Sequence, residues 1–377
     1  MKLGDLRTPA LVLDRATVER NTAMMSARAL QHGVKLRPHV KTAKCAEVVK
    51  LATEGQFGGI TVSTLAEAEF FAGQGFRDII YAVGIQPGKF ADVIRLKRDG
   101  VDLKILIDDL EVARALVERA RAEAVRLEIL IEIDSGQGRA GLLPEADELV
   151  PLGRILNLPP YSQLAGVLTH AGQSYHVKGA AAIQAVAEDE RRALIRAAER
   201  LKQAGLPCPT LSAGATPTAT LGTRFDSLSE IRPGNYVFYD LTMVSLGVCK
   251  VEDIAVSVLA SVTGHNKKAG HILIDAGFMA LTKDQGAHDF LPDAGFGYVL
   301  DERARARLPG LAVAELNQEH GLIRVRGAQD YERLPIGARV RVLPNHSCAT
   351  AAMYSHYNVV EGATESVVGR WARCTGW

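Results

Sequence analysis

The stretch LKILIDDLEVARALVERARAEAVRLEILIEID (Leu103–Asp134) shows the pattern on which the fold prediction depends. It begins and ends in short runs rich in Leu and Ile. Between them, Leu110–Arg121 places apolar residues at helical spacing, with Arg and Glu on the opposite face. A strand, a helix and a second strand in this order join two parallel strands. The stretch therefore predicts a parallel sheet with crossover helices.

The same alternation extends outward on both sides, from about residue 15 to about residue 240. A second long helix is predicted over Ala181–Ala204. The predicted strands are Val34–Pro38, Gly59–Val62, Asp78–Val83, Leu103–Ile107, Leu127–Asp134, Leu164–His170, Thr210–Ser212 and Tyr236–Tyr239. Eight is the number at which such a sheet closes, so we predict a (β/α)8 barrel, with an open doubly wound sheet as the alternative.

Beyond about residue 245 the sequence reads as strands with little helix, separated by Gly, Pro, Asn and Asp. The predicted strands are Ile254–Val262, His271–Ile274, Gly321–Val325, Arg339–Leu343 and Val367–Trp371, with Leu11–Leu13 expected to pair with them. We therefore expect an α/β chain in two domains: a barrel over 15–245 and a mainly antiparallel β domain over 246–377 together with 1–14.

Composition excludes several classes of protein. Among 377 residues, 44 Lys and Arg stand against 43 Asp and Glu, which gives no electrostatic basis for binding nucleic acid or membrane. The five cysteines are widely spaced and lack a C-x-x-C pair, as expected of thiols in a reducing compartment. The apolar run near the N-terminus is too short for a signal peptide, and no run is long enough for a membrane span. We expect a cytoplasmic protein.

A lysine follows the first predicted barrel strand, in RPHVKTAK (Arg37–Lys44). Thr42 is expected to cap the next helix, which places Lys41 at the carboxyl mouth of the strand. Barrel enzymes carry catalytic groups there, and a partly desolvated lysine suits Schiff-base chemistry. A solvated basic turn is the alternative.

Loops after later strands add further candidates. DSGQGRAG (Asp134–Gly141) contains a formal G-x-G-x-x-G, but no helix follows at once, so we expect a Gly-rich loop that presents Arg139 to the barrel mouth. LTHAGQSY offers His170 and Tyr175. Small residues at the last two strands fit a barrel phosphate site. The candidate residues there are Gly214, Ala215, Thr216, Gly234, Asn235 and Tyr236.

The segment PNHSCAT (Pro344–Thr350) places His346 and Cys348 two residues apart just after a strand. On one extended segment the two side chains share a face, so a nitrogen and a thiolate could take two positions of a tetrahedral Zn2+. Two ligands are half a site, and a core Cys beside a hydrogen-bonded His is the alternative.

Taken together, these segments resemble the fold-type III, alanine-racemase-like pyridoxal-phosphate enzymes, and within them the zinc-dependent D-serine dehydratases. D-threonine aldolases and D-threo-3-hydroxyaspartate dehydratases are near relatives in this resemblance. It extends over essentially the whole chain, in the family's order. The further segments that carry it are TPALVLD (Thr8–Asp14), ITVSTLAEAEFFA (Ile60–Ala72), GATPT (Gly214–Thr218), RPGNYVFYD (Arg232–Asp240) and NQEHG (Asn317–Gly321).

The resemblance implies roles for the candidate residues. Lys41 would carry the pyridoxal phosphate, Arg139 and Tyr175 would lie around its ring, and the loops at strands seven and eight would hold its phosphate. His346 and Cys348 match the zinc pair. Ala43 departs from the His that many relatives carry there. Cys348, where the aldolases tend to carry an Asp, favours zinc and dehydration over Mn2+ or another hard ion.

The implied activity is dehydration of D-serine to pyruvate and ammonia, with Lys41 removing the Cα proton and Zn2+ stabilising the departing hydroxide. The alternatives are a D-threonine aldolase, which yields glycine and acetaldehyde, and a D-threo-3-hydroxyaspartate dehydratase. A cofactor carrier would need neither His346 and Cys348 nor the β domain. An NAD oxidoreductase would need an acidic ribose ligand, and a binuclear hydrolase would need a His-x-His on the first strand. The sequence shows neither. The fold type also implies a head-to-tail homodimer.

Overall fold

The computed structural model describes residues 1–304 and 306–377. Its contacts divide the chain into two compact units. The β unit consists of Met1–Thr22 and Asn235–Thr375, and the barrel unit of Ala23–Gly234 with Gly376–Trp377.

The barrel unit contains, among these described residues, a sheet of eight parallel strands in the order β2-β9-β8-β7-β6-β5-β4-β3. A parallel bridge between His39 and Thr61 joins the two ends of that order and closes the sheet, which confirms the predicted (β/α)8 barrel. The strands are β2 (Lys35–Leu36), β3 (Ile60–Val62), β4 (Asp78–Gly84), β5 (Asp102–Ile107), β6 (Leu127–Ile133), β7 (Ser162–Thr169), β8 (Thr210–Ala213) and β9 (Glu230–Ile231).

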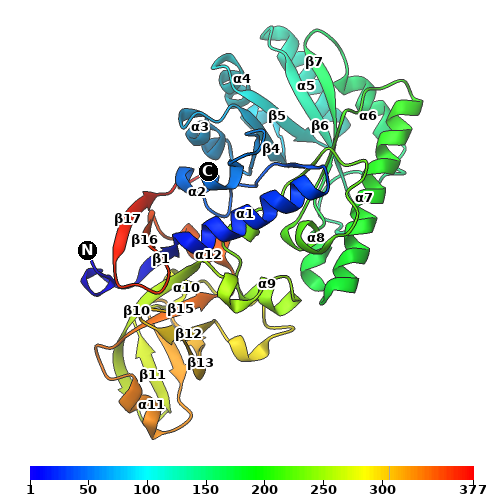
Figure 1. Cartoon of the computed structure of the whole chain (residues 1–377). Helices are drawn as coiled ribbons and strands as arrows, with labels where there is room; N and C mark the ends of the chain where they lie inside the picture. The colour runs from blue at the N-terminus through cyan, green and yellow to red at the C-terminus, as the bar shows by residue number, and fades with distance from the viewer. Residues whose placement is uncertain (305) are drawn as a thin grey trace. The chain divides into compact units, whose positions relative to one another are not determined.

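Helices cover the outside of this sheet (Figure 1). They are α1 (Arg15–Gln31), which crosses the division between the units, α2 (Ala46–Thr53), α3 (Leu65–Gly73), α4 (Phe90–Arg98), α5 (Leu110–Ala122), α6 (Leu149–Leu156), α7 (Ala180–Gln203) and α8 (Thr216–Leu221). In α5, Asp109 caps the first turn by accepting from the N–H groups of Glu111 and Val112, each at 2.8 Å. Leu116 on its inner face is fully buried, which contributes roughly 1.5–3 kcal/mol.

Two local predictions in the barrel are wrong. Tyr236–Tyr239 is not the eighth strand: Glu230–Ile231 is, and Asn235–Val237 forms a 3-10 helix in the β unit. The aromatic run is apolar because it is buried there, with the ring of Phe238 packed edge-on against Tyr357 at 5.4 Å. The segment after β9 therefore begins at Arg232 and lies at the carboxyl end of the last strand.

The second wrong prediction concerns the helix after Lys41. It begins at Ala46 with Cys45 at the N-cap, and Thr42 lies in the preceding turn. Lys44 in that turn has a φ of 47°. A non-glycine residue in the left-handed region interrupts the helical path, so α2 cannot extend back to Thr42.

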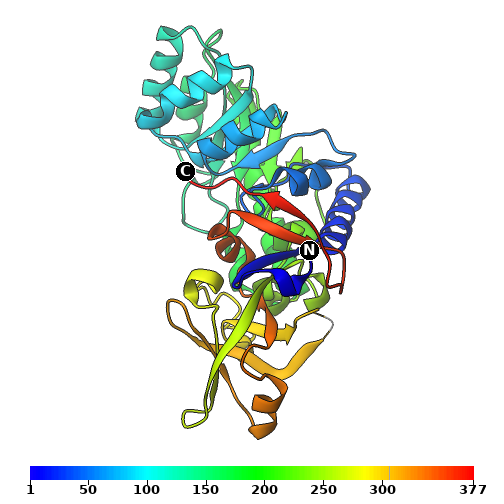
Figure 2. The same ribbon diagram turned by 90° about the vertical axis from the view of Figure 1, so that its left-hand side faces the viewer.

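The β unit contains a sheet of nine strands within the described residues, in the order β11-β14-β13-β12-β15-β10-β1-β16-β17. The long strand β10 pairs with β11 and with β15, which is orange in Figure 2. The strands are β1 (Ala10–Asp14), β10 (Val256–Asn266), β11 (His271–Ile274), β12 (Gly297–Asp301), β13 (Arg307–Leu316), β14 (Gly321–Arg324), β15 (Arg339–Pro344), β16 (His356–Val360) and β17 (Val367–Ala372). Short helices connect them: α9 (Leu241–Leu246), α10 (Phe278–Leu281), α11 (Ala328–Arg333) and α12 (Ser347–Ala352).

The predicted pairing of the N-terminal strand is confirmed. β1 pairs with β10 in antiparallel fashion, Val12 opposite Ser257, and with β16 in parallel fashion, Val12 opposite Asn358. Strands β12, β13 and β16 escaped the sequence analysis. In β13 the reason is plain, because Pro309 and Gly310 interrupt the pattern and both normally weaken a strand.

Among the described residues, no helix combines the length and the apolarity that crossing a membrane requires.

Candidate active site

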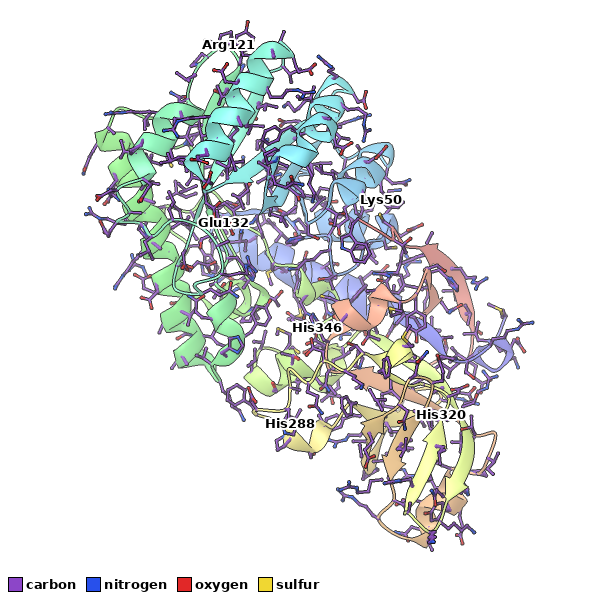
Figure 3. All side chains as sticks on the ribbon, turned by 180° about the vertical axis from the view of Figure 1, so that it is seen from behind. Lys50, Arg121, Glu132, His288, His320 and His346 are labelled. Atoms are coloured by element: carbon purple, nitrogen blue, oxygen red, sulfur yellow. The ribbon has the colours of Figure 1, made fainter. Side chains whose placement is uncertain are left out.

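A cavity of about 210 Å3 opens at the carboxyl ends of the barrel strands. Figure 3 labels Glu132, which enters it from β6. The cavity is lined by His39, Lys41, Ser63, Ala82, Val83, Gly84, Glu132, Arg139, Ala140, Leu168, His170, Gly214 and Arg232. Four of the residues predicted from the sequence, Lys41, Arg139, His170 and Gly214, are therefore brought together at one place.

Lys41 lies in the turn between β2 and α2, with its side chain exposed at the cavity wall. Within the described part of the chain its amine has no hydrogen-bond or ion-pair partner. The next lysine is different: Lys44 Nζ lies 3.0 Å from a carboxylate oxygen of the buried Glu67. Of the two amines in this turn, only that of Lys41 is available to a ligand in the cavity.

Two imidazoles lie beside Lys41, and both are held neutral. Burial, with the positive charge of Lys41 next, lowers the pKa of His170 to about 3, and the same two causes lower the pKa of His39 well below its usual value. His170 Nδ1 donates to the carbonyl oxygen of Gly214 at 3.0 Å. A carbonyl can only accept, so Nδ1 carries the proton and Nε2 is left with its lone pair. The Tyr175 ring lies 6.3 Å from that of His170.

Arg232, which sequence analysis did not single out, is a buried cation in the cavity wall. Its Nη1 donates to Ser212 Oγ at 2.7 Å and to the carbonyl of Ala213, and its Nη2 donates to the carbonyl of Thr169. Burial lowers its pKa to about 10, although Glu230 opposes the shift, so it stays charged at neutral pH. The guanidinium thus joins the ends of three barrel strands.

Glu190 on α7 is a second residue that sequence analysis missed. Its Oε1 accepts from the N–H groups of Gly214 at 2.8 Å and Ala171 at 3.2 Å, and its Oε2 accepts from Thr218 Oγ1 at 2.9 Å. Burial raises the pKa of this carboxyl, while these donors oppose the shift. One buried side chain therefore holds the loops after β7 and β8, which carry His170 and Gly214.

Glu132 and Arg139 give the cavity an acid and a second guanidinium. Glu132 is 6% exposed, and Arg139 Nη2 lies 3.8 Å from its Oε1. Burial, and then the nearby Asp108, raises the pKa of Glu132. Arg139 itself is half exposed, so its side chain can approach a ligand that enters the cavity.

The Gly-rich loop after β6 is folded around its own carboxylate. Asp134 Oδ1 accepts from the N–H groups of Gly136, Gln137 and Gly138 at 2.8–3.1 Å. These are the donors that a dinucleotide phosphate would need, and the next helix begins only at Leu149. The loop positions Arg139, as the sequence analysis expected.

The predicted phosphate residues are divided between the units. Ala215 and Thr216 are buried beside Gly214 in the barrel unit, at the start of α8. A Cβ on Gly214 would come within 2.5 Å of the Arg232 backbone, and one on Gly234 within 2.8 Å of the His39 carbonyl. Both glycines are thus required for close packing of the loops. A substitution at Gly214 would disturb the backbone, so it cannot test phosphate binding separately.

Asn235 and Tyr236 belong to the β unit and are buried there. The side-chain amide of Asn235 donates to Asp240 Oδ2 at 2.6 Å and to Ser347 Oγ at 3.1 Å. Asp240 Oδ2 also accepts from the Ser347 N–H at 3.0 Å. Both hydrogens of the Asn235 amide are therefore used to hold the turn that carries His346 and Cys348.

His346 precedes α12 in the β unit, and Figure 3 labels it. Its Nδ1 lies 2.6 Å from Asp284 Oδ2. Burial opposes protonation, but Cys348, which hydrogen-bonds with the ring, and Asp284 outweigh it and raise the pKa of His346 to about 11. Negative groups of this kind would equally stabilise a metal cation. Over residues 1–304 and 306–377, no cluster of three or more His, Cys, Asp or Glu has the geometry of a metal site.

The missed residues left faint signals in the sequence. Glu190 stands at an inward position of an amphipathic helix, where an apolar residue is expected. Arg232 is the first residue of the RPGNY segment, of which Gly234, Asn235 and Tyr236 were predicted to bind phosphate. Asp284 carries no local signal, because its partner His346 is distant in the chain.

Comparison with known proteins identifies the family to which the chain belongs. Residues 13–241 match the family model of the alanine racemase N-terminal domain, and residues 255–360 match that of the serine dehydratase domain. The chain is 43% identical to D-threo-3-hydroxyaspartate dehydratase of Delftia sp. over 99% of this chain and 98% of that one. It is 32% identical to D-serine dehydratase of Dictyostelium discoideum, over 97% of this chain and 96% of that one.

The solved structure of the Delftia dehydratase superposes with a TM-score of 0.96 at 42% identity, over 100% of both chains. Variants of that enzyme have been solved with a histidine or a cysteine changed to alanine at positions two apart, and the cysteine variant is described as the metal-free form. This chain accordingly belongs to the alanine-racemase-like family of pyridoxal-phosphate enzymes, and within it to the lyases that include the D-hydroxy amino acid dehydratases.

Proposed function

We propose that this enzyme dehydrates a D-β-hydroxy amino acid and that its substrate is D-threo-3-hydroxyaspartate, in place of the D-serine that the sequence analysis put first. The observation that carries the proposal is the 43% identity over nearly the whole chain with the Delftia dehydratase of that substrate. The charge of the cavity supports it, because Lys41, Arg139 and Arg232 face one carboxylate, Glu132. Such an excess of cations suits a substrate with two carboxylates.

The cavity fits pyridoxal phosphate. Its volume is about 210 Å3, and the amine of Lys41 faces it without a partner among the described residues. Lys41 would hold the cofactor covalently. His170, Tyr175, Arg139 and Arg232 would surround the ring, and the loop at Gly214–Thr216 would face the phosphate.

The donors His346 and Cys348 fit a divalent metal, since an imidazole nitrogen and a thiolate are ligands that Zn2+ prefers. The metal-free cysteine variant of the Delftia enzyme supports a metal at the corresponding pair. A thiolate favours Zn2+ over Mn2+ or Mg2+, which prefer oxygen ligands. It also favours dehydration over the aldolase alternative, for which the sequence analysis expected an Asp at this position.

When bound, the cofactor supplies an electron sink for the charge left at Cα, and the metal supplies positive charge for the departing hydroxyl. The chain's own residues do the rest. Lys41 Nζ is the base that takes the Cα proton. His170 cannot give up a proton from Nε2 near neutral pH, because its pKa of about 3 leaves that nitrogen unprotonated. Arg139, whose side chain is half exposed, binds a substrate carboxylate and orients the Cα–H bond.

The experiment compares three substrates on the purified enzyme. D-threo-3-hydroxyaspartate should yield oxaloacetate and ammonia, faster than D-serine yields pyruvate and ammonia. Removal of the metal with a chelator should stop both reactions, while β-chloro-D-alanine, whose leaving group needs no metal, should still be eliminated. Formation of glycine and an aldehyde as the sole products, with no ammonia, would establish the aldolase alternative and overturn the proposal.

A further inference from the structure

Asp284 contacts the imidazole of His346 from a different part of the β unit. It lies between α10 and β12, whereas His346 lies between β15 and α12. The Oδ2 of Asp284 and the Nδ1 of His346 are 2.6 Å apart. A carboxylate accepts at this distance, so Nδ1 carries the hydrogen and stays bound to Asp284, and Nε2 is the nitrogen that would exchange its proton for a metal ion.

The two oxygens of Asp284 are both occupied. Oδ2 accepts from His346, and Oδ1 accepts from the N–H of Gly286 at 2.9 Å. The main-chain N–H of Asp284 donates to Thr282 Oγ1 at 3.4 Å. The carboxylate is therefore fixed by its own loop and directed at the ring, which is the arrangement of a group that orients a ligand.

The turn that follows His346 is fixed as well. Asp240 accepts from the N–H and the hydroxyl of Ser347, the residue between His346 and Cys348. Asp240 thus restrains the main chain between His346 and Cys348 but not the rotation of the imidazole. Asp284 is the group in position to set it.

Resting on the metal pair of the proposed function, we propose that Asp284 is a positioning residue: by accepting the Nδ1 hydrogen of His346, it presents Nε2 to the metal beside Cys348. A metal-binding histidine whose second nitrogen has such an acceptor is held in one tautomer and one orientation. Without the acceptor, the ring can rotate or exchange its proton, and part of the binding energy is lost in ordering it.

The test measures Zn2+ affinity of the full-length, cofactor-loaded enzyme by competition with a chromophoric chelator. Asp284→Ala should weaken Zn2+ binding by about 10–100-fold, the usual cost of losing such a partner. Asp284→Asn should weaken it less, because the amide oxygen still accepts from Nδ1. The matched control is Asp289→Ala, which removes an exposed carboxylate of the same loop and should leave the affinity unchanged.

Spectroscopy separates positioning from a general loss of structure. With Co2+ in place of Zn2+, Asp284→Ala should keep the thiolate-to-metal absorption of Cys348 but alter the d–d bands, which report the geometry of the remaining ligands. Unchanged Zn2+ affinity in Asp284→Ala would refute the proposal. X-ray absorption that assigns a metal–oxygen bond to Asp284, lost equally in the Ala and Asn variants, would refute it too by making Asp284 a ligand.

The proposed metal site and the positioning role of Asp284 can be refuted separately. If His346→Ala and Cys348→Ala each bind Zn2+ as tightly as the unmodified enzyme, the metal pair is wrong, whatever Asp284 does. If those two variants lose the metal and Asp284→Ala does not, only the positioning role is wrong.

Discussion

Changing Glu190 to Ala removes the acceptor that ties the loops after β7 and β8 together. The main-chain N–H groups of Ala171 and Gly214 then lose their partner in a buried setting. Each orphaned donor costs about 1–3 kcal/mol, so the two together cost about 2–6 kcal/mol. This is a large share of the roughly 5–15 kcal/mol that stabilises a folded domain.

Changing Glu190 to Gln gives a different result on the same geometry. The Gln carbonyl can still accept from Ala171 and Gly214, and its amide can donate to Thr218 Oγ1. The Thr218 hydroxyl then donates to the Ala215 carbonyl, 3.3 Å away. The second hydrogen of the new amide has no acceptor among the described residues in this buried setting, so the Gln variant should lose about 1–3 kcal/mol, less than the Ala variant.

The pH dependence has a definite sign. Burial raises the pKa of Glu190 above its usual value of about 4.5, so the native state of the unmodified enzyme loses stability as the pH rises from about 4.5 through that raised pKa. The Gln variant has no carboxyl to ionise at this position. Its free energy of unfolding should therefore rise relative to that of the unmodified enzyme as the pH rises through this range.

Urea unfolding followed by circular dichroism, at pH 4.5 and at pH 7.5, measures both variants. If Gln is as destabilising as Ala, the charge of Glu190 matters more than its accepted hydrogen bonds, and the reasoning is refuted. A loss below about 1 kcal/mol for Ala would equally show that the two loops do not depend on this side chain.

Borohydride treatment of the enzyme should attach the cofactor to Lys41, and Lys41→Ala should abolish turnover; peptide mapping that finds the cofactor on Lys44 would contradict this. Because the pKa of His170 is lowered to about 3, the native state should lose stability as the pH falls from about 6.5 toward 3. In thermal unfolding at several pH values, His170→Gln should make stability depend less on pH over this range. An unchanged pH dependence would mean that other groups cause the loss. Cys348→Asp should lower Zn2+ affinity, admit Mn2+ and raise the ratio of retro-aldol to dehydration products with D-threonine, as measured by product analysis; equal Zn2+ affinity would count against thiolate ligation. Sedimentation at assay concentration should find a homodimer, and a fully active monomer would exclude a site shared between subunits.

The barrel, the strand pairing of the N-terminus and most strands of the β unit were predictable from the sequence. Their signal is local: periods of two and of about 3.6 residues follow from which faces of a strand or helix are buried, and neighbours in the chain carry them. The motifs around Lys41 and His170 were predictable for the same reason, because each follows directly on a strand that the pattern identifies.

The exceptions show what local signals lack. Tyr236–Val237 has strand-like composition because it is buried. A buried 3-10 helix favours the same apolar residue types as a buried strand, so composition does not distinguish the two. The true eighth strand, Glu230–Ile231, is two residues long and half polar, so it carried no period at all.

The partners of the site's polar groups were decided by the tertiary structure alone. Glu190 hydrogen-bonds with Gly214, Arg232 with Thr169, and Asp284 with His346, and the two partners in each pair are distant in the sequence. A buried charge is tolerated only where folding brings donors or opposite charges to it, and one sequence does not record which distant residues will arrive. The sequence by itself determined which residues could do chemistry. The tertiary structure decided which of these side chains are fixed in position, which are charged and which point into the cavity, because those properties depend on distances through space.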